Sequence, residues 1–282
     1  MKLIISILAL YMVGAHAVVQ EQMFKGTAKL VEVLIPNELL SQKTLKFSCR
    51  RGSKEAKTYP YITKENRLFA LIAETYYSEF ETISCHINET KVAEILVLDK
   101  AYPITYLRVP SEQTSPSPET QARIEREQTL LGKVYATSSS TLLYDKPFVV
   151  PLDSVVTSPY GVKRIYNNGE LAGYHSGIDY RAATGTSLYS ANSGKVILAQ
   201  DLFVTGNTVI IDHGKRLFTI YAHMSKISVT VGQIVKQKQL IGLAGATGRV
   251  TGPHLHWGVR LHSTLVDGNT IVSETETFFD RF

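Results

Sequence analysis

Cysteine is scarce in this sequence, and dense charge and long apolar runs are absent. The 282 residues include only two cysteines, too few for a cysteine-based metal cluster. After the amino terminus no apolar run approaches the roughly 20 residues that a membrane helix requires. The 30 basic and 25 acidic residues are interleaved and form no basic stripe. We therefore expect no integral membrane segment in the mature protein and no nucleic-acid partner.

The amino terminus has the three-part pattern of a secretory signal peptide. Lys2 precedes an apolar run over residues 3–13, and small residues occupy the −3 and −1 positions of a cleavage site after Ala17. No cysteine follows this site, so a lipoprotein anchor is not expected. We predict that residues 1–17 are removed and that the mature protein works outside the cytoplasm.

Glycine content divides the rest of the chain. Residues 18–150 contain three glycines, whereas residues 151–282 contain fifteen. Short alternating runs at 28–35, 44–49, 67–74, 80–87, 94–99 and 104–109 predict a small antiparallel β-sandwich over residues 18–112. A linker over 113–150 contains a charged helix with Ser117 or Thr114 as its cap. Residues 151–282 predict a second, mainly β domain with close turns and no helical period longer than two turns.

The two cysteines lie in inward-facing rows of two predicted strands. Cys49 alternates with Leu45 and Phe47, and Cys85 alternates with Ile83. Cysteines in an oxidising compartment tend to pair. We predict a disulfide between Cys49 and Cys85 that crosses the sandwich core.

Histidines are concentrated in the second domain, which contains six of the eight. His175 and Asp179 would share one face of a strand, with Gly177 between them leaving space for an ion. His254 and His256 would also share a face, because they are two residues apart.

A third strand contributes His223. Phe218, Ile220 and Ala222 form its predicted apolar face, so Thr219, Tyr221 and His223 would form the polar face. Three strands presenting such residues permit a zinc site with two imidazoles, one carboxylate and an open position. Two further histidines would then orient and deprotonate a water and stabilise an oxyanion. Tyr221 is a candidate substrate contact on the same predicted face.

The segments HSGIDY, YAHM and TGPHLHWGV, in this order, resemble the lysostaphin/LytM family of zinc metallopeptidases. Members of this family are endopeptidases, and sometimes carboxypeptidases, that cut peptide bridges in peptidoglycan. The resemblance covers about residues 155–270 and implies an antiparallel peptidase sheet. It implies that one zinc ion is bound by three side chains, those of His175, Asp179 and His256.

The same resemblance assigns further roles. It makes His223 and His254 the catalytic pair, and it places Arg164, within TSPYGVKR, beside the cleft. The Arg-x-His-Pro sequence that the family often has between Arg164 and His175 is missing here.

These features predict a secreted zinc-dependent peptidoglycan hydrolase, a D,D-endopeptidase with carboxypeptidase activity as a second expectation. The alternative is a catalytically silent module that binds or regulates other cell-wall hydrolases; the five filled positions favour the enzyme. A net charge of +5 suits anionic surroundings such as a cell wall. We expect a monomer in a Gram-negative periplasm or secreted. The bond cut and the role of the N-terminal domain (inhibition, targeting or spacing) stay open.

Overall fold

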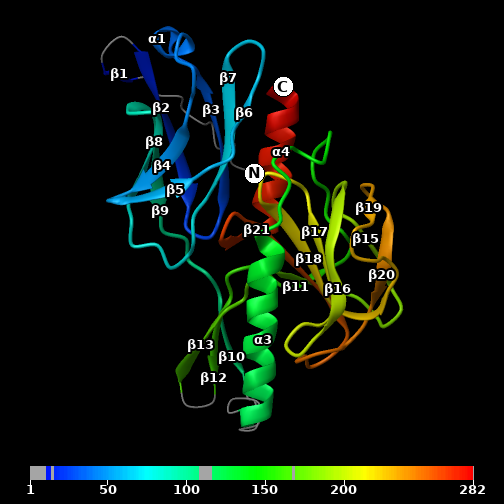
Figure 1. Ribbon diagram of the computed structural model, residues 1–282. Helices are drawn as coiled ribbons and strands as arrows, with labels where there is room; N and C mark the ends of the chain where they lie inside the picture. Colours follow the sequence, from blue (N-terminus) through cyan, green and yellow to red (C-terminus); the bar gives the residue numbers. More distant parts are fainter. Residues whose placement is uncertain (1–10, 14–15, 108–115, 167–168, 282) are drawn as a thin grey trace.

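The computed structural model describes residues 11–13, 16–107, 116–166 and 169–281. Two β-rich parts flank two longer helices (Figure 1), with the N-terminal strands at the upper left and the C-terminal sheet at the right. Most of the predicted signal peptide lies outside the described residues. Strand β2 begins at His16, and its pairing with strand β9 starts at Val19. Cleavage after Ala17 would therefore leave that pairing intact.

The N-terminal part is a sandwich of two sheets, as predicted. Its elements are β1 (Tyr11–Val13), β2 (His16–Phe24), β3 (Ala28–Leu34), α1 (Asn37–Leu40), β4 (Phe47–Arg51), β5 (Lys54–Lys57), β6 (Tyr61–Ile62), β7 (Arg67–Ala73), β8 (Thr82–Ile87) and β9 (Thr90–Leu98). One sheet has the order β1-β2-β9-β8-β4-β5 and the other β3-β7-β6. The expectation that the sandwich is wholly antiparallel is wrong, because β2 and β9 run parallel.

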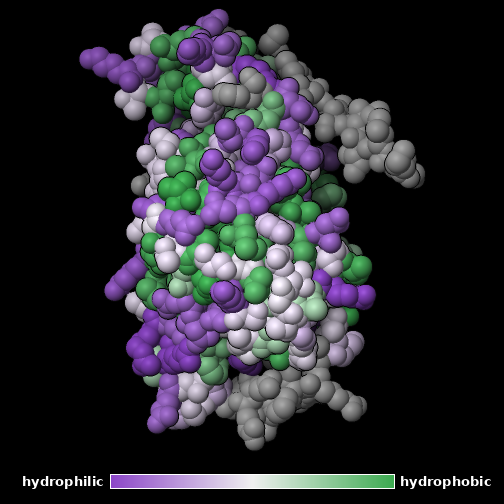
Figure 2. Space-filling view, turned by 90° about the vertical axis from the view of Figure 1, so that its right-hand side faces the viewer, coloured by the Kyte–Doolittle hydropathy of each residue, from purple (hydrophilic) through white to green (hydrophobic). Residues whose placement is uncertain are grey.

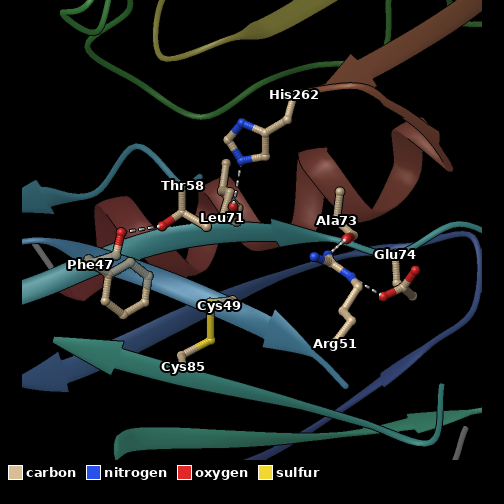
Figure 3. Close-up of a disulfide and its surroundings, with 9 residues drawn as sticks. All are labelled: Phe47, Cys49, Arg51, Thr58, Leu71, Ala73, Glu74, Cys85 and His262. Atoms are coloured by element: carbon tan, nitrogen blue, oxygen red, sulfur yellow. Dashed lines mark hydrogen bonds and ion pairs between the residues drawn. A yellow bond between two sulfur atoms is a disulfide. The ribbon is translucent and has the colours of Figure 1, made fainter. Parts of the chain in front are cut away.

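The predicted disulfide is present and joins neighbouring strands. Cys49 on β4 lies directly opposite Cys85 on β8, and their sulfur atoms are bonded (Figure 3). Both side chains are fully buried. The bridge therefore lies within one sheet, and the expectation that it crosses the sandwich core is wrong. It links positions 36 residues apart and restricts the unfolded chain.

The linker helix is attached to the second domain. Helix α3 (Pro118–Tyr135) begins after Ser117, whose side chain accepts a hydrogen bond from the Thr120 N–H, so the Ser117 cap is confirmed. Residues of its last two turns pack on the C-terminal sheet, in a cluster with Leu198, Leu202, Ile210 and Phe218. Arg123 pairs with Asp201. Helix α3 is thus part of the wall of the second domain.

The C-terminal part is built on one large sheet. Its elements, with the strand that precedes α3, are β10 (Ile104–Leu107), β11 (Val156–Ser158), β12 (Lys163–Tyr166), β13 (Glu170–Tyr174), β14 (Ile178–Arg181), β15 (Ser187–Tyr189), β16 (Gly194–Leu202), β17 (Gly206–Asp212), β18 (Leu217–Ile227), β19 (Ile234–Val235), β20 (Leu240–Ala244), β21 (His254–Leu261), β22 (Thr264–Val266) and α4 (Gly268–Arg281). The main path is β11-β14-β21-β18-β17-β16-β19. Strand β10 leaves the sandwich and pairs with β12 beside this sheet.

The two faces of the large sheet pack against different groups of side chains. One face buries the main core around fully buried Leu255, Trp257 and Val259. The other face carries the cluster beneath α3 at one end and the side chains of His254 and His256 at the other. Side-chain alternation along β21 separates these two environments.

Helix α4 joins the two parts of the molecule. Ala28 and Leu30 of edge strand β3 donate their N–H groups to Thr270 Oγ1 (3.0 Å) and Glu274 Oε2 (2.9 Å) of α4. Phe278 packs edge-on against Phe69 of β7. The helix therefore covers an otherwise open sheet edge. A helix of 14 residues contradicts the expectation of no helical period beyond two turns in this domain. Across the described residues, no helix has the length and apolar character needed to span a membrane.

Buried His213 makes the free energy of unfolding depend on pH. Burial lowers its pKa to about 4, whereas an unfolded histidine titrates near 6.5. Between these values the unfolded chain binds a proton that the folded chain rejects, so the free energy of unfolding falls as the pH drops. We expect a loss of about 3 kcal/mol from this group between pH 7 and pH 4.

Denaturant unfolding of wild type and His213→Gln across this pH range measures the effect. The variant should show a pH slope smaller by up to about one proton. Equal slopes in the two proteins would contradict the assignment.

Candidate metal and catalytic site

Three side chains bring their ligand atoms together at one point. His175 Nε2 lies 2.9 Å from Asp179 Oδ1 and 3.1 Å from His256 Nδ1, and the last two atoms are 2.8 Å apart. All belong to a group whose ligand atoms lie within 4.8 Å of one another. The three predicted ligands are therefore adjacent, although they come from segments up to 81 residues apart.

Strand pairing fixes two of the three. Asp179 on β14 is the direct antiparallel partner of His256 on β21. Directly opposed residues point to the same face of a sheet, so the carboxylate and the imidazole must meet. His254 lies on the same face, and Leu255 and Trp257 point into the core, as predicted.

His175 reaches the site differently from the prediction. It precedes β14 and does not share a strand with Asp179. Its N–H bonds to Val162 O, and its Nδ1 lies 2.9 Å from Pro159 O and 3.1 Å from Ser158 Oγ. A proton on Nδ1 donated to the Pro159 carbonyl leaves the Nε2 lone pair free for a metal. Such second contacts orient metal-ligating histidines.

Gly177 leaves space for the imidazole ring of His256. A Cβ at this position would lie 2.7 Å from both Cε1 and Nε2 of His256 and 2.6 Å from Trp257 O. The prediction that a side chain must be missing here is consistent with this geometry. The space, however, holds the His256 ring and not the ion that we expected over Gly177.

A β-bulge places His223. Asn207 pairs with Met224 and Val209 pairs with Tyr221, so β18 has one extra residue in this interval. His223 has a φ of 60°, in the left-handed region. A bulge of this kind reverses the alternation of side chains along the strand.

Because of this bulge, the prediction that Tyr221 and His223 share one face of β18 is wrong. Tyr221 is fully buried in the main core, where its hydroxyl accepts from Ala191 N at 2.7 Å and bonds to Thr219 Oγ1. The expectation that Tyr221 contacts substrate is therefore wrong. His223 instead turns toward His254, with ring centroids 4.9 Å apart.

Backbone carbonyls orient the two remaining histidines. His223 Nδ1 lies 2.9 Å from Thr247 O, and His254 Nδ1 lies 2.9 Å from Gly252 O. Each Nδ1 can donate its proton to that oxygen, which leaves Nε2 as the basic atom. Sequence reasoning missed these carbonyls, because residue types in a loop do not reveal carbonyl directions.

The electrostatics of the site favour an ionised carboxylate and neutral imidazoles. Burial alone would raise the pKa of Asp179, but its contacts with His175 and His256 hold that pKa well below the usual range. Burial lowers the pKa of His223 to about 4 and also lowers that of His256. These protonation states are the ones that metal binding requires.

Arg164 also reaches the site from the β12–β13 hairpin. Its Nη2 lies 3.7 Å from Asp179 Oδ2, the carboxylate oxygen that does not contact the imidazoles. The hairpin is present, although it lacks the Arg-x-His-Pro sequence.

The donor set fits zinc. Two imidazole nitrogens and one carboxylate oxygen are a recognised catalytic zinc set. Tetrahedral bonds of about 2.0–2.1 Å place donors about 3.3 Å apart, so these three would separate by only a few tenths of an ångström to hold the ion.

Comparisons with known proteins agree with this geometry. The family model described as peptidase family M23 matches residues 173–268, which include all five polar residues. Residues 173–268 thus have the sequence pattern of peptidase family M23. This match confirms the prediction that the second domain resembles a metallopeptidase.

Two curated relatives and one solved structure indicate the extent of the likeness. The chain is 40% identical over 109 residues to peptidoglycan DD-endopeptidase ShyA of Vibrio cholerae (38% of this chain, 25% of the relative). It is 34% identical over 122 residues to DD-carboxypeptidase/endopeptidase Mpg of Neisseria meningitidis (43% and 27%). It thus spans about a quarter of each relative's length. A peptidase M23 structure from Pseudomonas aeruginosa has a TM-score of 0.60 at 26% identity, covering 89% of this chain and 95% of that chain.

Removing the carboxylate ligand should abolish zinc-dependent stabilisation. Zinc at 100 times its dissociation constant should raise the free energy of unfolding of the wild type by about 2.7 kcal/mol. Asp179→Ala should lose this increment, and Asp153→Ala, which alters an exposed carboxylate, should keep it. Thermal unfolding with and without zinc measures it; equal increments in all three proteins would refute the ligand assignment.

Gly177→Ala tests the packing behind His256. The added Cβ should displace the imidazole and lower zinc affinity about tenfold or more. Gly132→Ala is the matched control, because nothing lies within 4 Å of a Cβ there. Zinc titration against a chelator gives the affinities, and circular dichroism checks the fold. Unchanged affinity in Gly177→Ala would show that His256 does not need this space.

Proposed function

We propose that this chain is a secreted, zinc-dependent peptidoglycan hydrolase that cleaves peptide cross-links as a D,D-endopeptidase. The observation that carries the proposal is the convergence of His175, Asp179 and His256 beside two further histidines, His223 and His254, whose Nδ1 atoms face backbone carbonyls. The names of the relatives, a DD-endopeptidase and a DD-carboxypeptidase/endopeptidase, support this substrate class. Carboxypeptidase activity on terminal D-Ala is the second activity we propose.

Zinc on the three ligands would lower the pKa of a bound water to about 7 and polarise the scissile carbonyl. His223 and His254 supply the proton transfers. A neutral imidazole with Nδ1 bonded to a carbonyl can accept the water proton at Nε2 and then deliver it from the same atom to the leaving amine. The other ring, when protonated, can donate to the carbonyl oxygen of the amide.

Arg164 is proposed to bind substrate. Its guanidinium is partly exposed beside Asp179, with 36% of the side chain accessible. Peptidoglycan stem peptides carry free carboxylates, and a guanidinium binds a carboxylate through paired hydrogen bonds.

A periplasmic or secreted monomer is the state we propose. The predicted signal peptide and the disulfide support an oxidising compartment outside the cytoplasm. Figure 2 shows polar and apolar side chains interspersed over the coloured part of the face that it presents. Such a surface differs from the broad apolar patch of an obligate dimer.

Replacing either catalytic histidine should separate chemistry from metal binding. His223→Ala and His254→Ala should each lower turnover of a cross-linked muropeptide by about 10²-fold or more while keeping one zinc per chain. His86→Ala, in the N-terminal sandwich, is the control and should keep both. Near-normal turnover in either site variant would reject its role.

Digestion of purified sacculi tests the function itself. Mass spectrometry of the released muropeptides should show loss of D,D-cross-linked dimers. Intact cross-links after treatment with the zinc-loaded protein would contradict the proposal.

A further inference from the structure

A cavity of about 690 Å³ lies between the N-terminal sandwich and the C-terminal sheet. Its walls come from strands β4 and β5, the loop between β7 and β8, Arg216, and the turn between β21 and β22. The volume lies within the range of small-molecule sites. His262 is at the far end of β21 from His254, about 25 Å along the strand at 3.3 Å per residue, so this cavity is distinct from the metal site.

One wall of the cavity holds a fixed guanidinium. Arg51 donates from Nε to Glu74 Oε2 and from Nη2 to Ala73 O, both at 2.6 Å (Figure 3). Glu74 is only 3% exposed and also accepts from Thr75 N. The Arg51 side chain is therefore held in place, and among the described residues nothing occupies its Nη1. It is a preorganised donor for a ligand oxygen.

The charges that line the cavity have both signs in equal number, three basic and three acidic side chains: Arg51, Lys54, Arg216, Glu55, Glu74 and Glu79. Among residues that the structure describes, Lys54 and Arg216 have no carboxylate partner, whereas Glu55 is paired with Lys46. Glu79 is the one carboxylate of the lining left without a partner there. Such a mixture disfavours a polyphosphate and suits a polyol that carries, at most, a single carboxylate.

Aromatic rings complete the lining. Tyr59 stacks on His262, with ring centroids 5.4 Å apart, and Tyr77 is 60% exposed. Phe80 also lines the cavity. Amphipathic rings give an apolar surface with polar atoms at the edge. The C–H faces of sugar rings pack on such surfaces, while donors such as Arg51 bind their hydroxyls.

We propose that this cavity binds a peptide-free sugar segment of the glycan strand, a disaccharide-sized unit whose muramic acid carboxylate, not bonded to a peptide, would meet Arg216 or Lys54. The identity of the polymer rests on the proposed function, because peptidoglycan joins amino sugars to the peptides that the metal site would cut. The ring of Tyr77 also packs edge-on against Tyr174, at 5.1 Å between centroids, and Tyr174 precedes His175. One residue of the cavity lining, Tyr77, thus contacts the residue that directly precedes His175.

The test is calorimetric titration of the full-length, zinc-loaded protein with a peptide-free N-acetylglucosaminyl–N-acetylmuramic acid disaccharide. This probe has no peptide bond to cut, so its binding does not depend on peptidase activity. We expect binding that Arg216→Gln and Tyr77→Ala each weaken about fivefold or more, the loss of roughly one hydrogen bond or ring contact. Lys238→Gln is the matched control, because Lys238 is exposed and shares a φ of 61° with Arg216.

Three outcomes would overturn the proposal. These are no disaccharide binding at millimolar concentrations, binding that both cavity variants leave unchanged, and a sugar-free stem peptide whose binding responds to the same variants. The last outcome would identify a peptide site. Failure of the sacculus digestion with disaccharide binding retained would instead reject only the peptidase activity.

Discussion

The contact between the Asp179 carboxylate and two imidazoles is the interaction on which the rest of the site depends. It exists because β14 and β21 pair with Asp179 directly opposite His256. A slip of one residue in this register would turn one of the two groups to the opposite face and bury a charge in the core. The large apolar residues on the core face, Leu255 and Trp257, therefore fix the register that brings Asp179 and His256 together.

The surrounding elements hold this sheet from both sides. Helix α3 packs on the face that bears the histidines, and α4 fastens the sheet to the edge of β3 in the sandwich. The loop between β7 and β8 contacts Tyr174 directly before His175. The N-terminal sandwich therefore contacts the segment that carries His175, a proposed zinc ligand, and it also forms part of the wall of the cavity proposed to bind sugar.

Much of the site could be predicted because its signals are local. The spacing of His254 and His256 places both on one face of a strand, and the family resemblance predicted His175 and Asp179 as their partners in a zinc site. The side chain of His223 could not be placed by alternation, since a bulge with one extra residue reverses the pattern in β18. The same bulge explains why Tyr221 was assigned to the wrong face.

In the fold, too, features set by neighbouring residues could be predicted, and features set by contacts between distant segments could not. The strands and the Ser117 cap were predictable from neighbouring residues, and the disulfide from two buried rows. The parallel pairing of β2 with β9 and the docking of α4 depend on contacts between distant segments. Anomalous scattering from a zinc-soaked crystal, measured at the zinc absorption edge, locates the ion. We expect one peak bonded to His175 Nε2, Asp179 Oδ1 and His256 Nδ1; a peak elsewhere, with these three atoms unbound, would contradict the proposed zinc site.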